Sequence, residues 1–177
     1  MTPIEFARQF HGVAGAHAAN LEVSWGDRTQ RTIQMFSVID DVTDALGVQV
    51  CLNPRQGKPR EHYKLDAVFY DGDGPRYDGW QYVWRMEATI EVENDARKSV
   101  IEMNKLVLFN TPLKVLVTFP RPAAVERLLT AFTDIVARGD TFGDFATLRR
   151  HLVILGVSPH RWSCFEYDGQ AFSEIHP

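Results

Sequence analysis

The stretch from Gln81 to Glu93 alternates apolar and polar residues over an unusually long run. This period-two spacing is typical of a β-strand and turns its polar side chains to one face, namely Arg85, Glu87, Thr89, Glu91 and Glu93. Asn94 or Asp95 can then cap a helix that ends near Phe109, and Leu113 to Phe119 is an apolar strand. A helix that joins two strands predicts a parallel crossover, so we expect an α/β sheet.

The segments before this unit supply the other strands of the predicted sheet. Residues 32–46 carry apolar residues at helical spacing, and Gly47 ends the predicted helix. Residues 48–52 form a short run rich in valine, which predicts a strand. Residues 62–70 alternate again, and the turn residues of 71–79 lead from this second strand into the long one. The second and third strands are therefore predicted to form an antiparallel hairpin.

The last third of the chain predicts additions to this core. We expect two helices and two weaker strands there, at 122–137, 142–150, 153–157 and 162–167. The chain has 177 residues, of which 45% are hydrophobic, and this is enough for one sizeable core. The sequence therefore predicts a single α/β domain over residues 1–177, with a mixed central sheet flanked by helices and a core at about residues 32–119.

Composition weakens several classes of function. No run approaches the roughly 18 apolar residues that cross a bilayer, and Met1 to Phe10 lacks the pattern of a signal peptide. We therefore expect a cytoplasmic protein without a membrane partner. Cys51 and Cys164 stand far apart with no partner at metal-ligand spacing, which predicts two buried thiols. The histidines lack the spacing of zinc hydrolases, and no serine-hydrolase or P-loop glycine pattern occurs.

Three carboxylates on the predicted hairpin form the one concentrated site for chemistry. Asp66 lies on the more polar face of its strand, and Glu91 and Glu93 share the polar face of the next strand. Neighbouring strands are about 5 Å apart, so the hairpin can bring the three together. Packed carboxylates repel one another unless a cation joins them, and Mg²⁺ or Mn²⁺ prefers oxygen ligands. The pattern predicts a divalent-metal site, and a polar sheet face that meets solvent is the alternative.

The element order and these carboxylates together resemble the PD-(D/E)XK, or restriction-endonuclease-like, nuclease superfamily. Its core is a helix, three antiparallel strands, a helix and a fourth strand. In that superfamily an Asp on the second strand and an E-x-K on the third bind the metal and orient water. Here KLDAVFY supplies Asp66, and ATIEVEND supplies Glu91 and Glu93. The order IEVEND, EMNKL and LKVLVTF also looks like a subgroup, mostly of unassigned function, that carries E-x-E-N.

The chain departs from the superfamily pattern at two positions. Leu65 stands where a proline usually precedes the Asp, and Glu93 stands where the lysine is expected. Other enzymes that resemble this superfamily carry the lysine on the following helix, where Lys98 and Lys105 are available here. Lys105 borders the apolar side of that helix and is the predicted catalytic assistant. The alternative is a solvated helix face on which Lys98 and Glu102 form an ordinary pair.

The resemblance implies a divalent-metal-dependent nuclease that hydrolyses phosphodiester bonds. Its catalytic residues would be Asp66, Glu91, Glu93 and Lys105, with the three carboxylates as ligands of Mg²⁺ or Mn²⁺. Nucleic acid is then the expected partner, with DNA ahead of RNA, and a homodimer is considered beside the monomer. The competing hypothesis is a non-catalytic binding or interaction module that retains the nuclease-like fold and has lost the catalytic lysine.

The charge distribution neither excludes nor indicates nucleic acid. The net charge is −4, but charge can be segregated on a protein surface. Several basic residues are candidate phosphate contacts, with ordinary solvated charge as the alternative: Arg55, Lys58, Arg60, Arg149, Arg150, His151 and Arg161.

Overall fold

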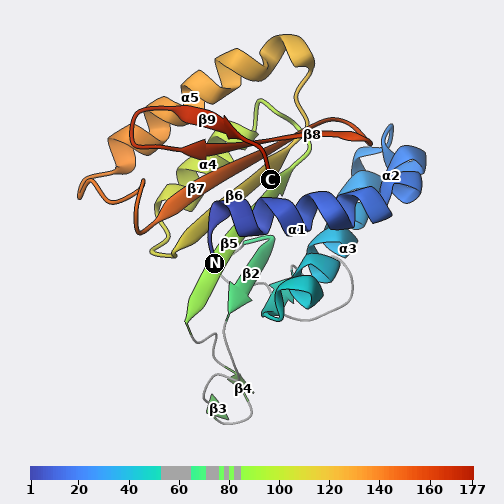
Figure 1. Cartoon of the computed structure of the whole chain (residues 1–177), viewed down its shortest axis with the longest axis horizontal. Helices are drawn as coiled ribbons and strands as arrows, with labels where there is room; N and C mark the ends of the chain where they lie inside the picture. The colour runs from blue at the N-terminus through green and yellow to red at the C-terminus, as the bar shows by residue number, and fades with distance from the viewer. Residues whose placement is uncertain (53–64, 71–75, 78–79, 82–84) are drawn as a thin grey trace.

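A seven-stranded mixed sheet runs through the centre of the protein, in the order β1-β2-β5-β6-β7-β8-β9 (Figure 1). The computed structural model describes residues 1–52, 65–70, 76–77, 80–81 and 85–177. The strands of the sheet are β1 (Gln49–Leu52), β2 (Ala67–Tyr70), β5 (Met86–Glu93), β6 (Leu113–Thr118), β7 (Arg150–Ser158), β8 (Arg161–Tyr167) and β9 (Phe172–Ile175). Strands β5, β6 and β7 are parallel, and the other neighbours pair antiparallel.

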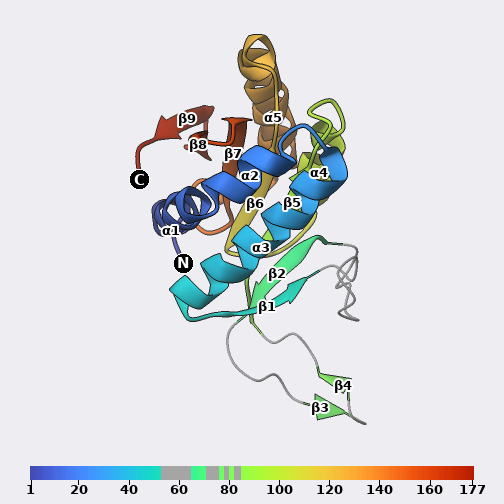
Figure 2. The same ribbon diagram turned by 90° about the vertical axis from the view of Figure 1, so that its right-hand side faces the viewer.

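Helices cover both faces of this sheet (Figure 2). In the described part of the chain these are α1 (Pro3–Ala16), α2 (Ala18–Ser24), α3 (Arg28–Leu46), α4 (Ser99–Val107) and α5 (Val125–Gly139), the last preceded by the 3-10 turn η2 (Pro122–Ala124). Helices α1 and α3 share one apolar core with the sheet, and α4 and α5 form a second core on the opposite face. The protein is therefore a three-layer α/β domain. None of the described helices has the length and apolar character needed to span a bilayer.

Local signals explain where the amino-terminal helices begin and end. The Asp27 side chain accepts hydrogen bonds from Thr29 N at 2.8 Å and Gln30 N at 3.1 Å, so α3 begins earlier than the predicted residue 32. Gly47 ends α3 as predicted, in the left-handed region with φ 67°. Helices α1 and α2 were not predicted from the sequence, although Thr2 and Glu5 form a capping box at the start of α1.

The long strand predicted from Gln81 to Glu93 is only partly confirmed, and its residues 82–84 lie outside the described part of the chain. Strand β5 begins at Met86, because Arg85 has φ 51° and this left-handed backbone ends the extended run. Before it, β4 (Trp80–Gln81) pairs with β3 (Arg76–Tyr77) in a separate two-stranded sheet that projects from the main one (Figure 1). The predicted strand at 62–70 is seen as β2, and residues 62–64 lie outside the described part of the chain.

The carboxyl-terminal third contains one wrong prediction and one strand that was missed. The predicted helix at 122–137 is confirmed as η2 followed by α5. The predicted helix at 142–150 is wrong, because this segment is a series of turns leading into β7. Asp140 accepts hydrogen bonds from Asp144 N and Phe145 N, and these bonds hold the turns instead of a helix. Strand β9 was not predicted. Of the two cysteines, Cys164 is buried and Cys51 is half-buried.

A buried polar cluster lies at the amino ends of β6 and β7. Lys114 and His151 are direct neighbours in the sheet, and both are fully buried. The Lys114 ammonium donates to Thr111 O at 3.1 Å and lies 5.0 Å from the centre of the Phe145 ring. Burial, and then the charge of Arg149, lower the pKa of Lys114 from 10.5 to about 7. Burial and the Lys114 charge also lower the pKa of His151.

This cluster makes stability depend on pH in a predictable direction. Between pH 7 and 10.5 the unfolded chain keeps the Lys114 proton that the folded protein has released, so Lys114 makes stability rise with pH there. We expect Lys114→Met to remove up to about 1.4 kcal/mol of this rise per pH unit. Urea unfolding at several pH values from neutral to mildly alkaline measures the difference in slope between variant and wild type.

The control for this prediction is Lys98→Met, at an exposed lysine of similar length. It should leave the pH slope of the unfolding free energy at the wild-type value. The other charged groups that act on Lys114 and His151 are Arg149, Asp140 and Asp144, and both variants retain them. Equal slopes in Lys114→Met and the wild type would contradict the assignment.

Candidate functional site

Asp66 and Glu91 meet where β2 begins beside β5. The two strands pair antiparallel with Ala67 opposite Ile90, so Asp66 and Glu91 are the next residues along this register. The Asp66 carboxylate accepts a hydrogen bond from Val92 N at 2.9 Å, which ties it to β5 immediately after Glu91. The structure therefore brings these two predicted site residues together on neighbouring strands.

Glu91 is buried beneath helix α4. Its face of β5 is polar in sequence, as predicted, but only 2% of Glu91 is exposed, so this part of the strand does not meet solvent. Lys105 on α4 reaches down to it, with Nζ 2.7 Å from Glu91 Oε1 and 2.6 Å from Glu102 Oε2. Both contacts are ion pairs, so the Lys105 ammonium engages one oxygen of each carboxyl group. Lys105 retains 29% exposure, so the cluster is reached from outside beside this side chain.

Three charged neighbours act on Glu91, namely Asp66, Glu102 and the Lys105 ammonium. Burial, and then the negative charge of Asp66, raise the pKa of Glu91 to about 9, although Lys105 opposes the shift. Burial acts to lower the pKa of Lys105, but its contacts with Glu102 and Glu91 outweigh burial and raise it. Lys105 is therefore protonated. A pKa of about 9 leaves Glu91 uncharged at neutral pH, and a further positive charge beside Asp66 and Glu91 would stabilise its ionised form.

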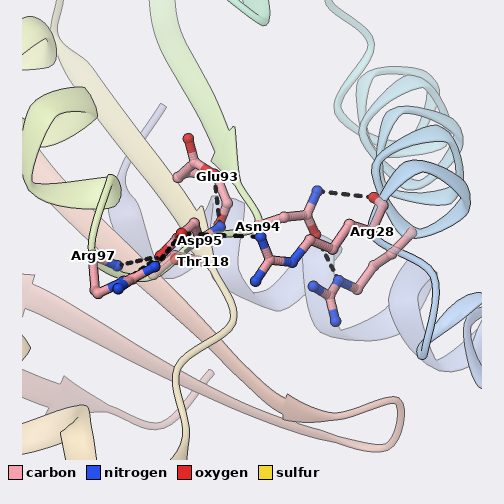
Figure 3. Close-up of polar contacts among 7 residues, drawn as sticks. Arg28, Glu93, Asn94, Asp95, Arg97 and Thr118 are labelled. Atoms are coloured by element: carbon pink, nitrogen blue, oxygen red, sulfur yellow. Dashed lines mark hydrogen bonds and ion pairs between the residues drawn. The ribbon is translucent and has the colours of Figure 1, made fainter.

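Glu93 makes its contacts with the turn that begins α4. Its Oε1 accepts a hydrogen bond from Asp95 N at 2.7 Å, and its backbone carbonyl accepts one from the Thr118 hydroxyl at 2.8 Å (Figure 3). One Glu93 oxygen is thus already engaged by the backbone. Lys98, the other lysine considered for the site, is exposed in the turn before α4, whereas Lys105 reaches the carboxylates.

The donor set can be compared with what a divalent ion requires. No three His, Cys, Asp or Glu side chains within residues 1–52, 65–70 and 85–177, or the short β3 and β4 strands, are grouped to hold a metal ion. Mg²⁺, however, is usually held by one or two carboxylates, with water and substrate phosphates as its other ligands. Asp66 and Glu91 supply two such carboxylates, of which Asp66 Oδ2 accepts from Val92 N and Glu91 Oε1 pairs with Lys105. Asp66 and Glu91 are thus the two carboxylates that could hold such an ion, and both they and Glu93 stay predictions as ligands.

Asn94, which follows these acids, joins the end of β5 to helix α3 (Figure 3). Its Oδ1 accepts a hydrogen bond from Arg31 Nε at 2.6 Å, and its Nδ2 donates to Arg28 O at 3.1 Å and to the Thr32 hydroxyl. The Arg31 side chain is also covered by the Phe119 ring, with its guanidinium carbon 4.3 Å from the ring centre. From the sequence, Asn94 was considered as the Asn of the E-x-E-N pattern and as a helix cap. The cap prediction is wrong, because α4 begins at Ser99 with Lys98 at the N-cap position.

The basic residues proposed as phosphate contacts are mostly engaged within the protein. Arg149 pairs with Asp144 at 2.6 Å, and Arg150 pairs with Glu166. His151 is fully buried, so the prediction that it contacts phosphate is wrong. Arg161 is exposed, and Arg55, Lys58 and Arg60 lie outside the described residues. Four other arginines, Arg28, Arg97, Arg121 and Arg127, line a pocket together with Asn94 and Asp95, and no sequence motif singled them out.

Comparison with known proteins identifies no relative of this chain. No family model matches the chain, and neither the curated proteins nor the solved structures yield a match. The functional argument therefore depends on the geometry and chemistry of the residues described above.

The link between Asn94 and Arg31 leads to a test of stability. Asn94→Ala removes the acceptor of a buried guanidinium, so we expect a loss of about 1 to 3 kcal/mol in the free energy of unfolding. Asn104→Ala is the matched control, because Asn104 is exposed on α4 and alanine favours a helix. Urea titration followed by circular dichroism measures both variants. A loss in Asn94→Ala no larger than in the control would contradict the structural role of Asn94.

Proposed function

We propose that this chain is a divalent-metal-dependent nuclease of the restriction-endonuclease-like superfamily, which hydrolyses phosphodiester bonds in nucleic acid. The contact between Lys105 and Glu91 carries the proposal. Position 93, where the superfamily pattern has a lysine, is Glu93 in this chain. Lys105 supplies the missing ammonium from helix α4, which follows β5. Together with Asp66 it completes a set of two carboxylates and one ammonium, the residue types that metal-dependent phosphodiester hydrolysis uses.

The topology gives a second line of support. Helix α3, the antiparallel strands β1, β2 and β5, helix α4 and the parallel strand β6 follow one another in the order of that superfamily's core. Asp66 immediately precedes the second of these strands, and Glu91 lies near the end of the third. The family relationship is thus a proposal from element order and site chemistry taken together, because fold alone does not establish activity.

Each residue has a distinct role in this proposal. Asp66 and Glu91 would hold Mg²⁺ or Mn²⁺, which when bound polarises a phosphodiester oxygen and lowers the pKa of water. Lys105 carries a positive charge that Glu91 and Glu102 hold in position, and it can stabilise charge that develops on the phosphate. Glu102 is therefore a positioning residue. Helix α4 covers the buried part of Glu91 and limits the access of bulk water.

The first prediction for this proposal concerns the two carboxylates. Glu91→Gln and Asp66→Asn should each lower cleavage at least about 100-fold, because each removes a ligand charge worth several kcal/mol to the transition state. The assay incubates the protein with single- and double-stranded DNA and RNA, with Mg²⁺, Mn²⁺ or a chelator. Asp134→Asn, at an exposed carboxylate of α5, is the matched control and should cleave like the wild type. Cleavage that persists in Glu91→Gln would contradict the assignment of activity to this site.

A second prediction separates the lysine from the metal ligands. Lys105→Met should lower kcat by about 100-fold while the Mn²⁺ concentration for half-maximal activity stays near the wild-type value, since Lys105 stabilises charge and does not hold the ion. Lys98→Met, at the exposed lysine of the preceding turn, should leave both quantities unchanged. If Lys105→Met changes the metal dependence and leaves kcat intact, the proposed role of Lys105 is wrong.

One observation favours the competing hypothesis of a non-catalytic module. The Lys105 ammonium is paired with two carboxylates at 2.7 and 2.6 Å, as it would be in a cluster that serves only to stabilise the domain. The two hypotheses differ in the assay above. A module of this kind shows no cleavage with any nucleic acid or metal ion, whereas the nuclease shows cleavage that a chelator abolishes.

A further inference from the structure

A pocket of about 470 Å³ opens at the carboxyl ends of strands β5 and β6. Four arginines line it from four segments of the chain: Arg28 at the start of α3, Arg97 before α4, Arg121 after β6 and Arg127 on α5. Asp95 is the one acidic side chain among its lining residues within the described chain. Because the whole protein has a net charge of −4, this concentration of positive charge opposes the overall sign.

Asp95 does not neutralise these cations. Its carboxylate accepts hydrogen bonds from the Arg97 guanidinium at 3.1 and 3.3 Å, and it lies 3.9 Å from Arg28 Nη1. Arg121 and Arg127 are exposed and form no ion pair with a described carboxylate. At least two guanidinium groups are therefore available to a ligand, while Asp95 orients a third.

A further positive charge lies behind the pocket wall. Arg31 is only 9% exposed, and its guanidinium donates to Asn94 Oδ1 at 2.6 Å and to Trp25 O at 2.9 Å. Phe119, a lining residue of the pocket, packs on the same guanidinium. All of these partners are neutral, and no described carboxylate forms an ion pair with Arg31. A buried charge is costly without a counter-charge, so an anion in the pocket would stabilise this arrangement.

We infer that this pocket binds the phosphate groups of a nucleic-acid strand and leads that strand to the Asp66–Glu91 pair. Guanidinium groups match phosphate oxygens in charge and in forked geometry. Strand β5 carries Glu91 and then runs into Asn94 at the pocket, a separation of about 10 Å at the rise of an extended chain. The inference rests on nucleic acid as the substrate class of the proposed function, but binding at the pocket requires neither metal nor cleavage.

The surroundings of the pocket favour a strand over a free phosphate ion. An apolar groove of about 330 Å³ adjoins it, lined by Val100, Leu128 and Ala131 and sharing Arg97 and Arg127 with the pocket. Phosphates held by the arginines would place the attached sugars and bases over this apolar surface, where the base faces lose contact with water. A bare phosphate makes no use of the groove.

The test measures binding without cleavage. Wild type and the double variant Arg121→Gln/Arg127→Gln are titrated, in the presence of a chelator, into fluorescein-labelled single-stranded and duplex DNA and RNA over a range of salt concentrations. We expect the double variant to bind at least about tenfold more weakly, and its slope of log K against log salt to fall by about two. Arg138→Gln is the matched control, since Arg138 lies on the same helix and pairs with Asp134 outside the pocket.

Each outcome of this test has a separate meaning. Wild-type affinity in the double variant, or an equal loss in Arg138→Gln, overturns the pocket assignment, provided that thermal unfolding shows both variants folded. Inorganic phosphate that displaces the labelled strand at low concentration also overturns it, because the site would then recognise a free ion. Loss of binding in the double variant together with no metal-dependent cleavage by the wild type supports the pocket and rejects the nuclease.

Discussion

Strands β5 and β6 run side by side in the same direction, so the chain between them must cross the sheet as helix α4. This crossover places α4 over the polar face of β5 and removes Glu91 from solvent. The burial would be costly for a carboxylate without a cation, and Lys105 on the same helix supplies one. The ion pair, the depth of the site and its opening beside Lys105 all follow from this connection.

The same parallel pairing brings the carboxyl ends of β5 and β6 to one edge of the sheet. Asn94 and Asp95 leave β5 there, and Phe119 and Arg121 leave β6 beside them. Asn94 binds Arg31, and this hydrogen bond ties the first turn of α3 to the same edge. Such edges are where α/β sheets bind ligands. The acidic cluster under α4 and the basic pocket at the strand ends thus both lie along β5. In the proposed function, the pocket would bind phosphates of the same nucleic-acid strand that is cleaved at the acidic cluster.

Local patterns predicted much of this arrangement. The alternation of residues 86–93 assigned Glu91 and Glu93 to one face. The helix expected between two apolar strands predicted the crossover correctly, although Asn94 and Asp95 do not cap it. Two predictions failed for local reasons. At Arg85 a positive φ ended the extended backbone, and at residues 142–150 a series of turns was predicted as a helix. Helices α1 and α2 were missed because they were not sought before residue 32, although the capping box of Thr2 and Glu5 was readable.

The sequence by itself determined the order of the main strands and helices from α3 to β6, the shared face of Glu91 and Glu93, and the choice of Asp66, Glu91, Glu93 and Lys105 as candidates. These features depend on spacing along the chain, because backbone geometry fixes the side to which each side chain points. Only the tertiary structure decided that Lys105 rather than Lys98 reaches Glu91, that Glu93 binds the turn before α4, and that four arginines line one pocket. Contacts between residues far apart in the chain depend on register and helix packing, and a local pattern does not contain either of these.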